Sequence, residues 1–433
     1  MATSSATFEE AFPFGAGAVK RYRLGNGLRV LILVDKSAPV VSYHTWFGVG
    51  SRHEKPGKTG LAHLFEHLMF NETESMKAGE FDRKLEESGA ESNAATWVDW
   101  TYYHEALPKD RLALAVKLES ERMARLVLRT PQVDSEKEVV ANERRYRVED
   151  DVEGAASELL YKTAFRKHPY HWPTIGWMSD IEGFTPDDCA AFYRTYYAPN
   201  NAAVIVVGDV READVLSRIE DAYGAIPRAE IPAEDYEPEP PQTDARLVEL
   251  KKPTASEKLY LGYHGPALGD ADHVPLTLLS EILFGGRASR AHRALVQGAE
   301  LASDVRGWVS TFRDPGLFEM HVTARPGVDS HVALAALDKE IDRVSRELVT
   351  DDELARAKAR LELGLLQSLD TASGKAETIG FYETVLGDPS AVFRRLRETR
   401  HVTASELRAA MRRTLLGQRT IVRVIPDGSE GNE

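Results

Sequence analysis

The residues best suited to chemistry lie in one short stretch, His63-Leu64-Phe65-Glu66-His67. A helix turns by about 100° per residue, so His63, Glu66 and His67 project from one helix face. Two imidazoles four residues apart can bind one divalent metal ion, and the carboxylate between them can accept a proton from a water molecule. The alternative interpretation is a polar helix face with two solvated or core histidines. A third ligand elsewhere in the chain would favour the metal site.

Two glutamates further along the chain are candidates for that ligand. Glu136 and Glu143 stand seven residues apart, which corresponds to two turns along one helix face. Ser135 and Glu138 have the spacing of a capping box, and Pro131 lies just upstream, so we predict that this helix begins near Ser135. Without the histidine motif, the sequence would favour a solvated helix surface for each glutamate, and only the motif reverses this interpretation.

The elements that must position these residues follow from hydrophobic periodicity. Valine, isoleucine and aromatic residues predict buried strands at residues 29–34 and 40–48. A helix that begins near Thr59 would carry the two histidines, and its expected core residues are Leu61, Leu64 and Leu68. On the helix that carries the glutamates, the expected core residues are Val139 and Val140.

The segment after the histidine motif predicts a hairpin between two helices. Residues 91–107 are rich in threonine, tryptophan, tyrosine and valine, so we expect two strands joined by a turn at Val98 and Asp99. Helical periodicity is present at residues 77–88 and 109–128.

Composition excludes several classes of protein. The 54 basic and 68 acidic residues give a net charge of −14, which disfavours nucleic acid and anionic lipid as partners and favours basic peptides. The one cysteine, Cys189, cannot form an internal disulfide or a thiolate metal site alone. Apolar runs are far shorter than the roughly 18 residues of a membrane-spanning helix. Residues 1–14 show no secretory signal, so we expect a cytoplasmic protein, or a periplasmic one if a signal was removed.

A break in composition divides the chain into two halves of similar length. Residues 227–253 are rich in proline and acidic residues and predict an exposed linker between an N-terminal domain, residues 9–226, and a C-terminal domain, residues 254–433. Each half opens with strand-type alternation and continues with amphipathic helical patterns, which points to a duplication.

The histidine motif resembles that of the pitrilysin-type metallopeptidases, in which histidine, two residues, glutamate and histidine follow in this order. Glu143, 76 residues after His67, matches the third metal ligand of that family. Glu136 matches a family glutamate that supports a ligand from outside the metal's own shell. The resemblance implies one zinc ion per chain, held by His63, His67 and Glu143, with Glu66 as the catalytic base. It also implies an α+β fold of two duplicated α/β-sandwich domains, each a mixed sheet covered by helices.

The same resemblance implies an activity and a way of binding substrate. The expected function is zinc-dependent endopeptidase hydrolysis of peptides or small unfolded polypeptides within a closed chamber. Residues 89–101 resemble the edge strand to which the family adds an extended substrate, and its expected contacts are Asn93, Ala94, Ala95 and Thr96. An ordinary buried strand is the alternative interpretation.

The second half resembles the repeated, non-catalytic domain of the same family at residues 285–290 and 312–318. Active relatives supply an arginine, and a tyrosine seven positions later, to hold the substrate carbonyl. Arg313 is the best match to the arginine, but Met320 stands at the tyrosine position. The pair therefore looks incomplete in this chain.

Two-domain relatives enclose their site by pairing two chains, so the resemblance implies a dimer. We expect a heterodimer in which a sister chain supplies the arginine and tyrosine pair, and a homodimer is the alternative. A non-catalytic core or assembly subunit of the same fold is the competing function. A peptide-binding or chaperone-like module that keeps zinc without turnover is a third.

Overall fold

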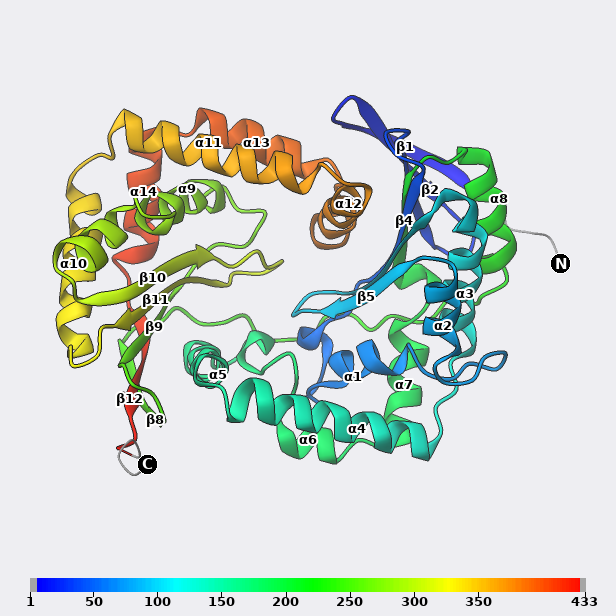
Figure 1. Cartoon of the computed structure of the whole chain (residues 1–433), viewed down its shortest axis with the longest axis horizontal. Helices are drawn as coiled ribbons and strands as arrows, with labels where there is room; N and C mark the ends of the chain where they lie inside the picture. The colour runs from blue at the N-terminus through cyan, green and yellow to red at the C-terminus, as the bar shows by residue number, and fades with distance from the viewer. Residues whose placement is uncertain (1–5, 429–433) are drawn as a thin grey trace. The chain divides into compact units, whose positions relative to one another are not determined.

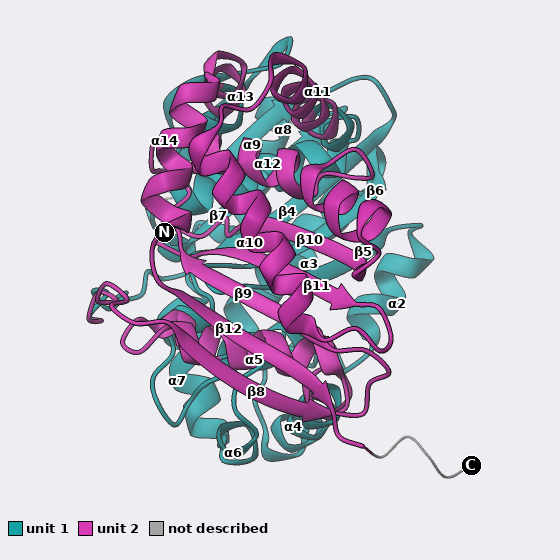
Figure 2. Cartoon of the chain, turned by 90° about the vertical axis from the view of Figure 1, so that its left-hand side faces the viewer, with its two compact units in different colours: residues 1–143, 173–235, 366–393 teal, residues 144–172, 236–365, 394–433 magenta. Residues whose placement is uncertain are grey.

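The computed structural model describes residues 6–428 and divides the chain into two compact units, shown in different colours in Figure 2. Unit 1 comprises residues 1–143, 173–235 and 366–393, and unit 2 comprises residues 144–172, 236–365 and 394–433. Each unit is built on one β-sheet. Within the described residues, no helix combines the length and the apolar character that a membrane crossing requires.

Unit 1 contains a seven-stranded sheet in the order β1-β2-β3-β7-β4-β6-β5. Figure 1 labels β1, β2, β4 and β5 of this sheet. Its strands are β1 (Thr7–Phe14), β2 (Gly17–Arg23), β3 (Arg29–Val34), β4 (Val40–Phe47), β5 (Glu91–Thr96), β6 (Thr101–Pro108) and β7 (Ala202–Gly208). β3 and β7 run parallel, and the other neighbouring pairs are antiparallel. The strands predicted at 29–34 and 40–48 are confirmed as β3 and β4. The hairpin predicted at 91–107 is confirmed as β5 and β6, with β5 at the edge of the sheet.

Helices cover both faces of this sheet. The helices of unit 1 are α1 (Leu61–Leu68), α2 (Glu80–Glu87), α3 (Leu112–Arg125), α4 (Thr130–Arg144), α6 (Met178–Glu182), α7 (Pro186–Tyr196), α8 (Glu212–Tyr223) and α12 (Ala372–Leu386). Short 3-10 turns are present at Ser51–His53, Lys109–Arg111 and Pro199–Asn201. The main core lies between the sheet and α1, α3, α7 and α8.

The opposite face of the unit 1 sheet packs against α12. Gly380 of α12 lies on Trp46 of β4, and a Cβ atom at position 380 would stand 2.0 Å from Trp46 Nε1. Only glycine permits this approach of the helix to the sheet. Glu383, one turn further along α12, binds Arg21 at 3.0 Å and Arg29 at 2.7 Å. These contacts fix α12 on the strands of unit 1.

Unit 2 contains a five-stranded sheet in the order β10-β11-β9-β12-β8. Its strands are β8 (Arg246–Lys252), β9 (Lys258–His264), β10 (Ala302–Val309), β11 (Leu317–Ala324) and β12 (Arg419–Pro426). β8 and β12 run parallel, and the other pairs are antiparallel. This is the order and direction of β5-β6-β4-β7-β3 in unit 1, so the predicted duplication and α+β fold class are confirmed.

The helices of unit 2 also surround its sheet. They are α5 (Val152–Ala164), α9 (His273–Phe284), α10 (Ser330–Arg346) and α14 (Ala404–Leu415), while α11 (Asp351–Ser368) and α13 (Ala391–His401) cross the boundaries between the units along the chain. Short π-helical segments lie at Arg145–Glu149 and His292–Gly298, and a 3-10 turn lies at Pro169–His171. The core of unit 2 lies between the sheet and α9, α10 and α14.

The two units are interleaved along the chain, which differs from the contiguous domains 9–226 and 254–433 expected from the sequence. Helix α5, from the first half, packs on β9 and β12 of unit 2, whereas α12, from the second half, packs on β4 and β7 of unit 1. Residues 144–172 and 366–393 therefore lie in the other unit from the one expected. The helical periodicity of a segment shows that one face is buried but not which sheet covers it.

The predicted linker also differs at its C-terminal end. Residues 225–243 contain no helix or strand, but Arg246–Lys252 form β8, which pairs with β12. Half-buried and exposed side chains alternate along β8, as in a strand with one solvated face. Glu249 and Lys251 lie on the exposed face of this edge strand, whereas Arg246 lies on the half-buried face and donates to the carbonyl oxygens of Thr163 and Ala164.

Candidate metal centre

Helix α1 positions the histidine motif by burying the opposite helix face. Leu61, Leu64 and Leu68 are buried in the core of unit 1, as predicted. On the other face, His63 is buried, and Glu66 and His67 are half-buried. The eight residues of α1 therefore hold the three polar side chains at the boundary between the core and solvent.

Helix α4 carries both glutamates but does not begin where the sequence predicted. It begins at Thr130, and Pro131 occupies its second position, where the missing N–H would in any case have no partner within the helix. Ser135 thus lies inside the helix and does not cap it. Val140 is buried as predicted, whereas Val139 is 46% exposed, because the buried stripe of α4 passes through Val133 and Val140.

The three candidate metal ligands converge. Within the part of the chain that the structure describes, His63, His67 and Glu143 form the one group of at least three histidine, cysteine or acidic residues arranged to hold a metal ion, with one ligand atom from each within 4.8 Å of the others. Glu143 Oε2 lies 3.5 Å from His63 Nε2 and 3.3 Å from His67 Nε2. The imidazole rings of His63 and His67 have centroids 5.1 Å apart. Helices α1 and α4 thus bring Glu143 to two histidines that stand 76 and 80 positions before it in the sequence.

Glu136 lies behind this group. Its Oε2 is 3.7 Å from His67 Nδ1, and its Oε1 accepts a hydrogen bond of 3.0 Å from Asn71 Nδ2. A carboxylate beside the second ring nitrogen of a ligand histidine fixes the tautomer and orientation of the ring. The role of Asn71 was not identified from the sequence, because it follows the helix and only its position after His67 could have indicated it.

Glu66 faces the edge strand as well as the histidines. Burial raises the pKa of Glu66, hydrogen bonds from the side chain and main chain of Thr96 and the charge of His67 oppose this shift, and Glu143 adds to it; the net pKa lies above the ordinary value. Carboxyl groups with raised pKa values in partly buried sites are suited to proton transfer near neutral pH. Glu66 lies on the side of α1 that contacts β5, and this partly buried position suits a general base.

The pKa of His67 depends on opposing influences. Burial lowers it, but hydrogen bonding and charge from Glu143, together with the charges of Glu66 and Glu136, raise it above its ordinary value. Three carboxylates therefore create a negative potential around this imidazole. Such a potential attracts either a proton or a metal cation.

The predicted substrate strand lies at the edge of the sheet. β5 pairs only with β6, and it lies beside α1 through Thr96, which is buried. Asn93 is exposed, and Ala94 donates its N–H to Asn93 Oδ1 at 2.9 Å and not to β6. The outer edge of β5 therefore runs past Glu66 and offers main-chain groups to an added strand.

The donor set fits zinc. Two imidazole nitrogens and one carboxylate oxygen form a known three-ligand set of catalytic zinc sites, which leaves one coordination position open. Magnesium and calcium favour all-oxygen sites, so two imidazoles argue against both.

Arg313 belongs to unit 2, in the loop between β10 and β11, and its side chain is exposed. Met320, seven positions later, is buried in the core of that unit. A tyrosine at this position would therefore point into the core. The structure thus offers no second member of the pair expected from the resemblance at this spacing.

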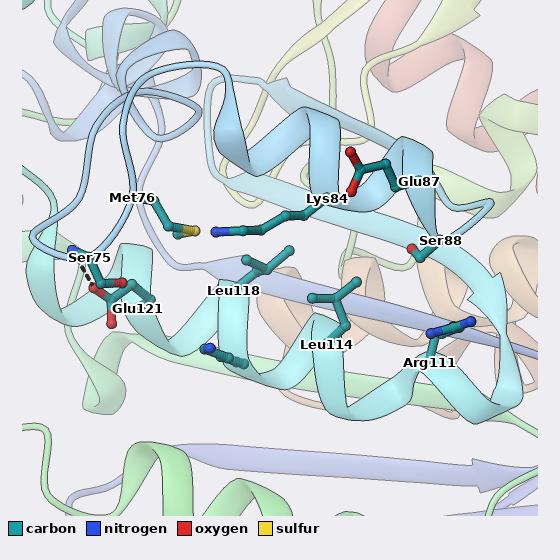
Figure 3. Close-up of a pocket in the computed structure, with 10 residues that line it drawn as sticks. Ser75, Met76, Lys84, Glu87, Ser88, Arg111, Leu114, Leu118 and Glu121 are labelled. Carbon is teal, nitrogen blue, oxygen red and sulfur yellow. Dashed lines mark hydrogen bonds between the residues drawn. The ribbon is translucent and has the colours of Figure 1, made fainter.

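A separate pocket lies between α2 and α3 in unit 1 (Figure 3). Its volume is about 480 Å³, and none of the candidate metal ligands lines it. The floor is apolar, with Met76, Leu114 and Leu118, and Lys84 extends across it toward Met76. This pocket is distinct from the histidine site.

Comparison with known proteins agrees with this geometry. The profile described as "Insulinase (Peptidase family M16)" matches residues 29–176, and the profile described as "Peptidase M16 inactive domain" matches residues 183–361. The first match contains His63, His67 and Glu143, and the second contains none of them. The zinc protease PqqE of Helicobacter pylori is 33% identical over 368 residues, which cover 83% of this chain and 82% of that protein.

Two further similarities extend over nearly the whole chain. An uncharacterized zinc protease of Streptomyces coelicolor is 28% identical over 418 residues, covering 95% of this chain and 90% of that protein. The crystal structure of a protease from Helicobacter pylori superposes with a TM-score of 0.91 at 30% identity, covering 94% of this chain and 99% of that one. From its sequence similarity and its fold, the chain belongs to peptidase family M16, the family of the pitrilysin-type metallopeptidases.

Proposed function

We propose that this chain is a zinc-dependent endopeptidase of the inverted histidine-glutamate-histidine type. His63, His67 and Glu143 would hold one zinc ion, and Glu66 would be the catalytic base. The observation that carries the proposal is the convergence of these ligands from α1 and α4 beside a half-buried carboxylate. The names of the relatives add independent support for zinc and for proteolysis.

Zinc, when bound, supplies Lewis-acid activation of water and of the substrate carbonyl. The Glu66 carboxylate accepts a proton from the attacking water, and it then donates this proton to the nitrogen of the leaving amine. Glu66 is thereby regenerated as a carboxylate. Glu136 orients His67 through Nδ1, and Asn71 holds Glu136 in place.

Substrate peptides would add to the outer edge of β5 as an extended strand, along Asn93, Ala94, Ala95 and Thr96. The position of β5 at the sheet edge and beside Glu66 supports this binding mode. Main-chain hydrogen bonds would supply affinity with little dependence on side chains. Because the chain has a net charge of −14, basic peptides are the favoured substrates.

The two matched profiles differ in which candidate residues they contain. The N-terminal match contains the three candidate ligands His63, His67 and Glu143, and the C-terminal match contains none of them. We propose a dimer that encloses the substrate, in which a sister chain supplies the arginine and tyrosine pair. Arg313 of this chain would be a substrate-binding residue that matches the arginine of the pair but lacks the tyrosine. A homodimer is the alternative. We propose a cytoplasmic or periplasmic location.

The test is a peptidase assay of the purified chain on a mixed library of quenched peptides. It is run with added zinc, with a chelator, and with or without the product of the neighbouring gene. Cleavage that the chelator abolishes and zinc restores is the expected result. Full activity of the isolated chain would contradict the heterodimer, and bound zinc without any cleavage would favour the non-catalytic subunit.

A further inference from the structure

The N-terminus of α1 is capped by a carboxylate from outside the helix. Glu54 is buried, with only 7% of its surface exposed, and follows the 3-10 turn Ser51–His53. Its Oε2 accepts the N–H of Gly60 at 2.8 Å, and its Oε1 accepts the N–H of Ala62 at 2.7 Å. The second bond is formed by the residue that directly precedes His63.

A side chain at the usual capping position could not replace this contact. Gly60 is the N-cap residue of α1 and has a φ of 97°. A Cβ atom there would lie 2.5 Å from the carbonyl oxygen of Ile175, so the position excludes serine, threonine and aspartate, the residues that normally cap a helix. Glu54 takes over this task from six residues upstream.

A second carboxylate anchors the residue before the cap. Asp180 Oδ2 accepts both the N–H of Thr59 at 3.0 Å and its hydroxyl at 2.7 Å. Thr59 Oγ1 in turn accepts the N–H of Trp177 at 3.0 Å. The chain entering α1 is therefore tied to residues 175–180, and Glu54 is the group that acts on the helix itself.

This arrangement bears on the metal site because α1 is short. An eight-residue helix is not stable alone, so contacts outside the helix must set its position. The later part of α1 is held by Tyr103, whose hydroxyl donates to the carbonyl oxygen of Phe65 at 3.0 Å. Glu54 is the corresponding contact at the end that carries His63. A shift at this end changes the distance between His63 and Glu143, which belongs to α4.

We propose that Glu54 is a positioning residue for the metal site: by capping α1 through Gly60 and Ala62, it holds His63 at the place where His67 and Glu143 can share one zinc ion with it. This inference rests on the proposed zinc site. Burial raises the pKa of Glu54, the N–H bonds from Ala62 and Gly60 oppose this shift because they stabilise the carboxylate, and the charge of Asp180 adds to the shift. In the carboxylate, each oxygen accepts one of the two N–H groups. An amide offers one acceptor oxygen and turns its NH₂ group toward a donor.

The test compares Glu54→Gln with Glu383→Gln, a change of a second buried glutamate in unit 1. Glu383 is a residue of α12 that binds Arg21 of β2 and Arg29 of β3, and it does not touch α1. Zinc affinity is measured by competition with a chromogenic chelator, thermal unfolding is followed by circular dichroism, and the Co²⁺ spectrum reports ligand geometry. Loss of partners outside the metal's own shell typically weakens binding by about 10- to 100-fold.

We expect both variants to unfold at lower temperature, but only Glu54→Gln to bind zinc about 10-fold or more weakly and to alter the Co²⁺ spectrum. Glu54→Asp, which withdraws the carboxylate by one methylene, should weaken zinc binding to an intermediate extent and serves if Glu54→Gln does not fold. Unchanged zinc affinity in the folded Glu54 variants, or equal weakening in Glu383→Gln, would overturn the inference. If the wild-type chain binds no zinc, the proposed site itself fails.

Discussion

Unit 1 and unit 2 share one order of five strands but differ in what their first helices carry. In unit 1, α1 follows β4 and presents His63, Glu66 and His67 at the boundary of the core. In unit 2, α9 occupies the same place after β9, and leucine and isoleucine side chains fill it, including Leu278 and Ile282, which are fully buried. The same fold thus supports a polar site in one unit and a continuous apolar core in the other.

The one histidine of α9 illustrates the difference. His273 is buried at the start of the helix, with Nε2 at 3.1 Å from the carbonyl oxygen of Ser310 and Nδ1 at 2.7 Å from Arg395. Both ring nitrogens are therefore occupied by structural partners. In α1, by contrast, His63 and His67 face the carboxylate of Glu143. A histidine becomes a candidate ligand through its neighbours and not through its presence on the helix.

The largest expected effect is a difference in peptidase activity between variants of α1 and variants of α9. Glu66→Gln should lower kcat/KM on a cleaved peptide by about 100- to 10,000-fold, because an amide cannot accept the proton from water. Zinc content should remain at one per chain. The matched control is Glu281→Gln on α9, which contacts Arg360 and should leave kcat/KM unchanged. Retained activity in Glu66→Gln would exclude Glu66 as the base.

The next effect concerns zinc binding by Glu143 of α4. Glu143→Gln should weaken zinc binding by more than about 100-fold, since it replaces a charged ligand and not an outer partner. Its control is Glu353→Gln on α11, where Glu353 binds Arg290 through two contacts of 2.7 Å. Zinc titration should show no change in the control, although its unfolding temperature should fall. Equal zinc affinities in the two variants would remove Glu143 from the site.

A third effect concerns pH and unit 2. Burial, and then the charge of Arg395, lower the pKa of His273 to about 4 from 6.5. The unfolded chain therefore binds a proton that the folded chain does not, so folding stability is full above about pH 6.5 and falls as the pH drops toward 4, by roughly 3 kcal/mol.

Urea unfolding across this pH range checks the effect. His273→Asn should lose less stability than the wild type between pH 6.5 and 4, whereas the exposed control His331→Asn should follow the wild-type curve. Parallel curves for His273→Asn and the wild type would show that His273 does not titrate as inferred.

The smallest expected effect concerns the edge strand. Ala94 donates its N–H to Asn93 Oδ1 and not to β6, and an added peptide strand would take this donor in place of the Asn93 side chain. Ala94→Pro therefore removes the donor while sparing the pairing with β6. One lost hydrogen bond of about 0.5–1.5 kcal/mol should raise KM by about 2- to 10-fold with little change in kcat. Unchanged KM for a series of peptides would argue against strand addition at this edge.

Much of this site could be predicted from local sequence. The helix pattern of residues 61–68 placed the two histidines and Glu66 on one face, because their spacing alone determines their direction. The threonine, tryptophan, tyrosine and valine content of residues 91–107 likewise identified β5 and β6. The convergence of Glu143 on His63 and His67 depends on how α4 packs on α1, and local periodicity could only make that glutamate a candidate.

Other features lay beyond such patterns. The predicted start of α4 was five residues too late. Ser135 and Glu138 have the spacing of a capping box, but the helix already begins at Thr130, and Pro131 suits its first turn. The exchange of α5 and α12 between the units is a choice of packing partner, which periodicity does not encode. Glu54 gave no local signal, since its capping partners are six and eight residues away and the contact depends on a glycine turn.

The most direct test of the comparison is a crystal structure of the zinc-loaded chain with anomalous scattering measured at the zinc edge. One zinc peak is expected per chain, about 2.0–2.2 Å from an imidazole nitrogen of His63, an imidazole nitrogen of His67 and a carboxylate oxygen of Glu143, and no peak is expected at α9. A chain without zinc at these residues, or with its zinc bound elsewhere, would contradict the account.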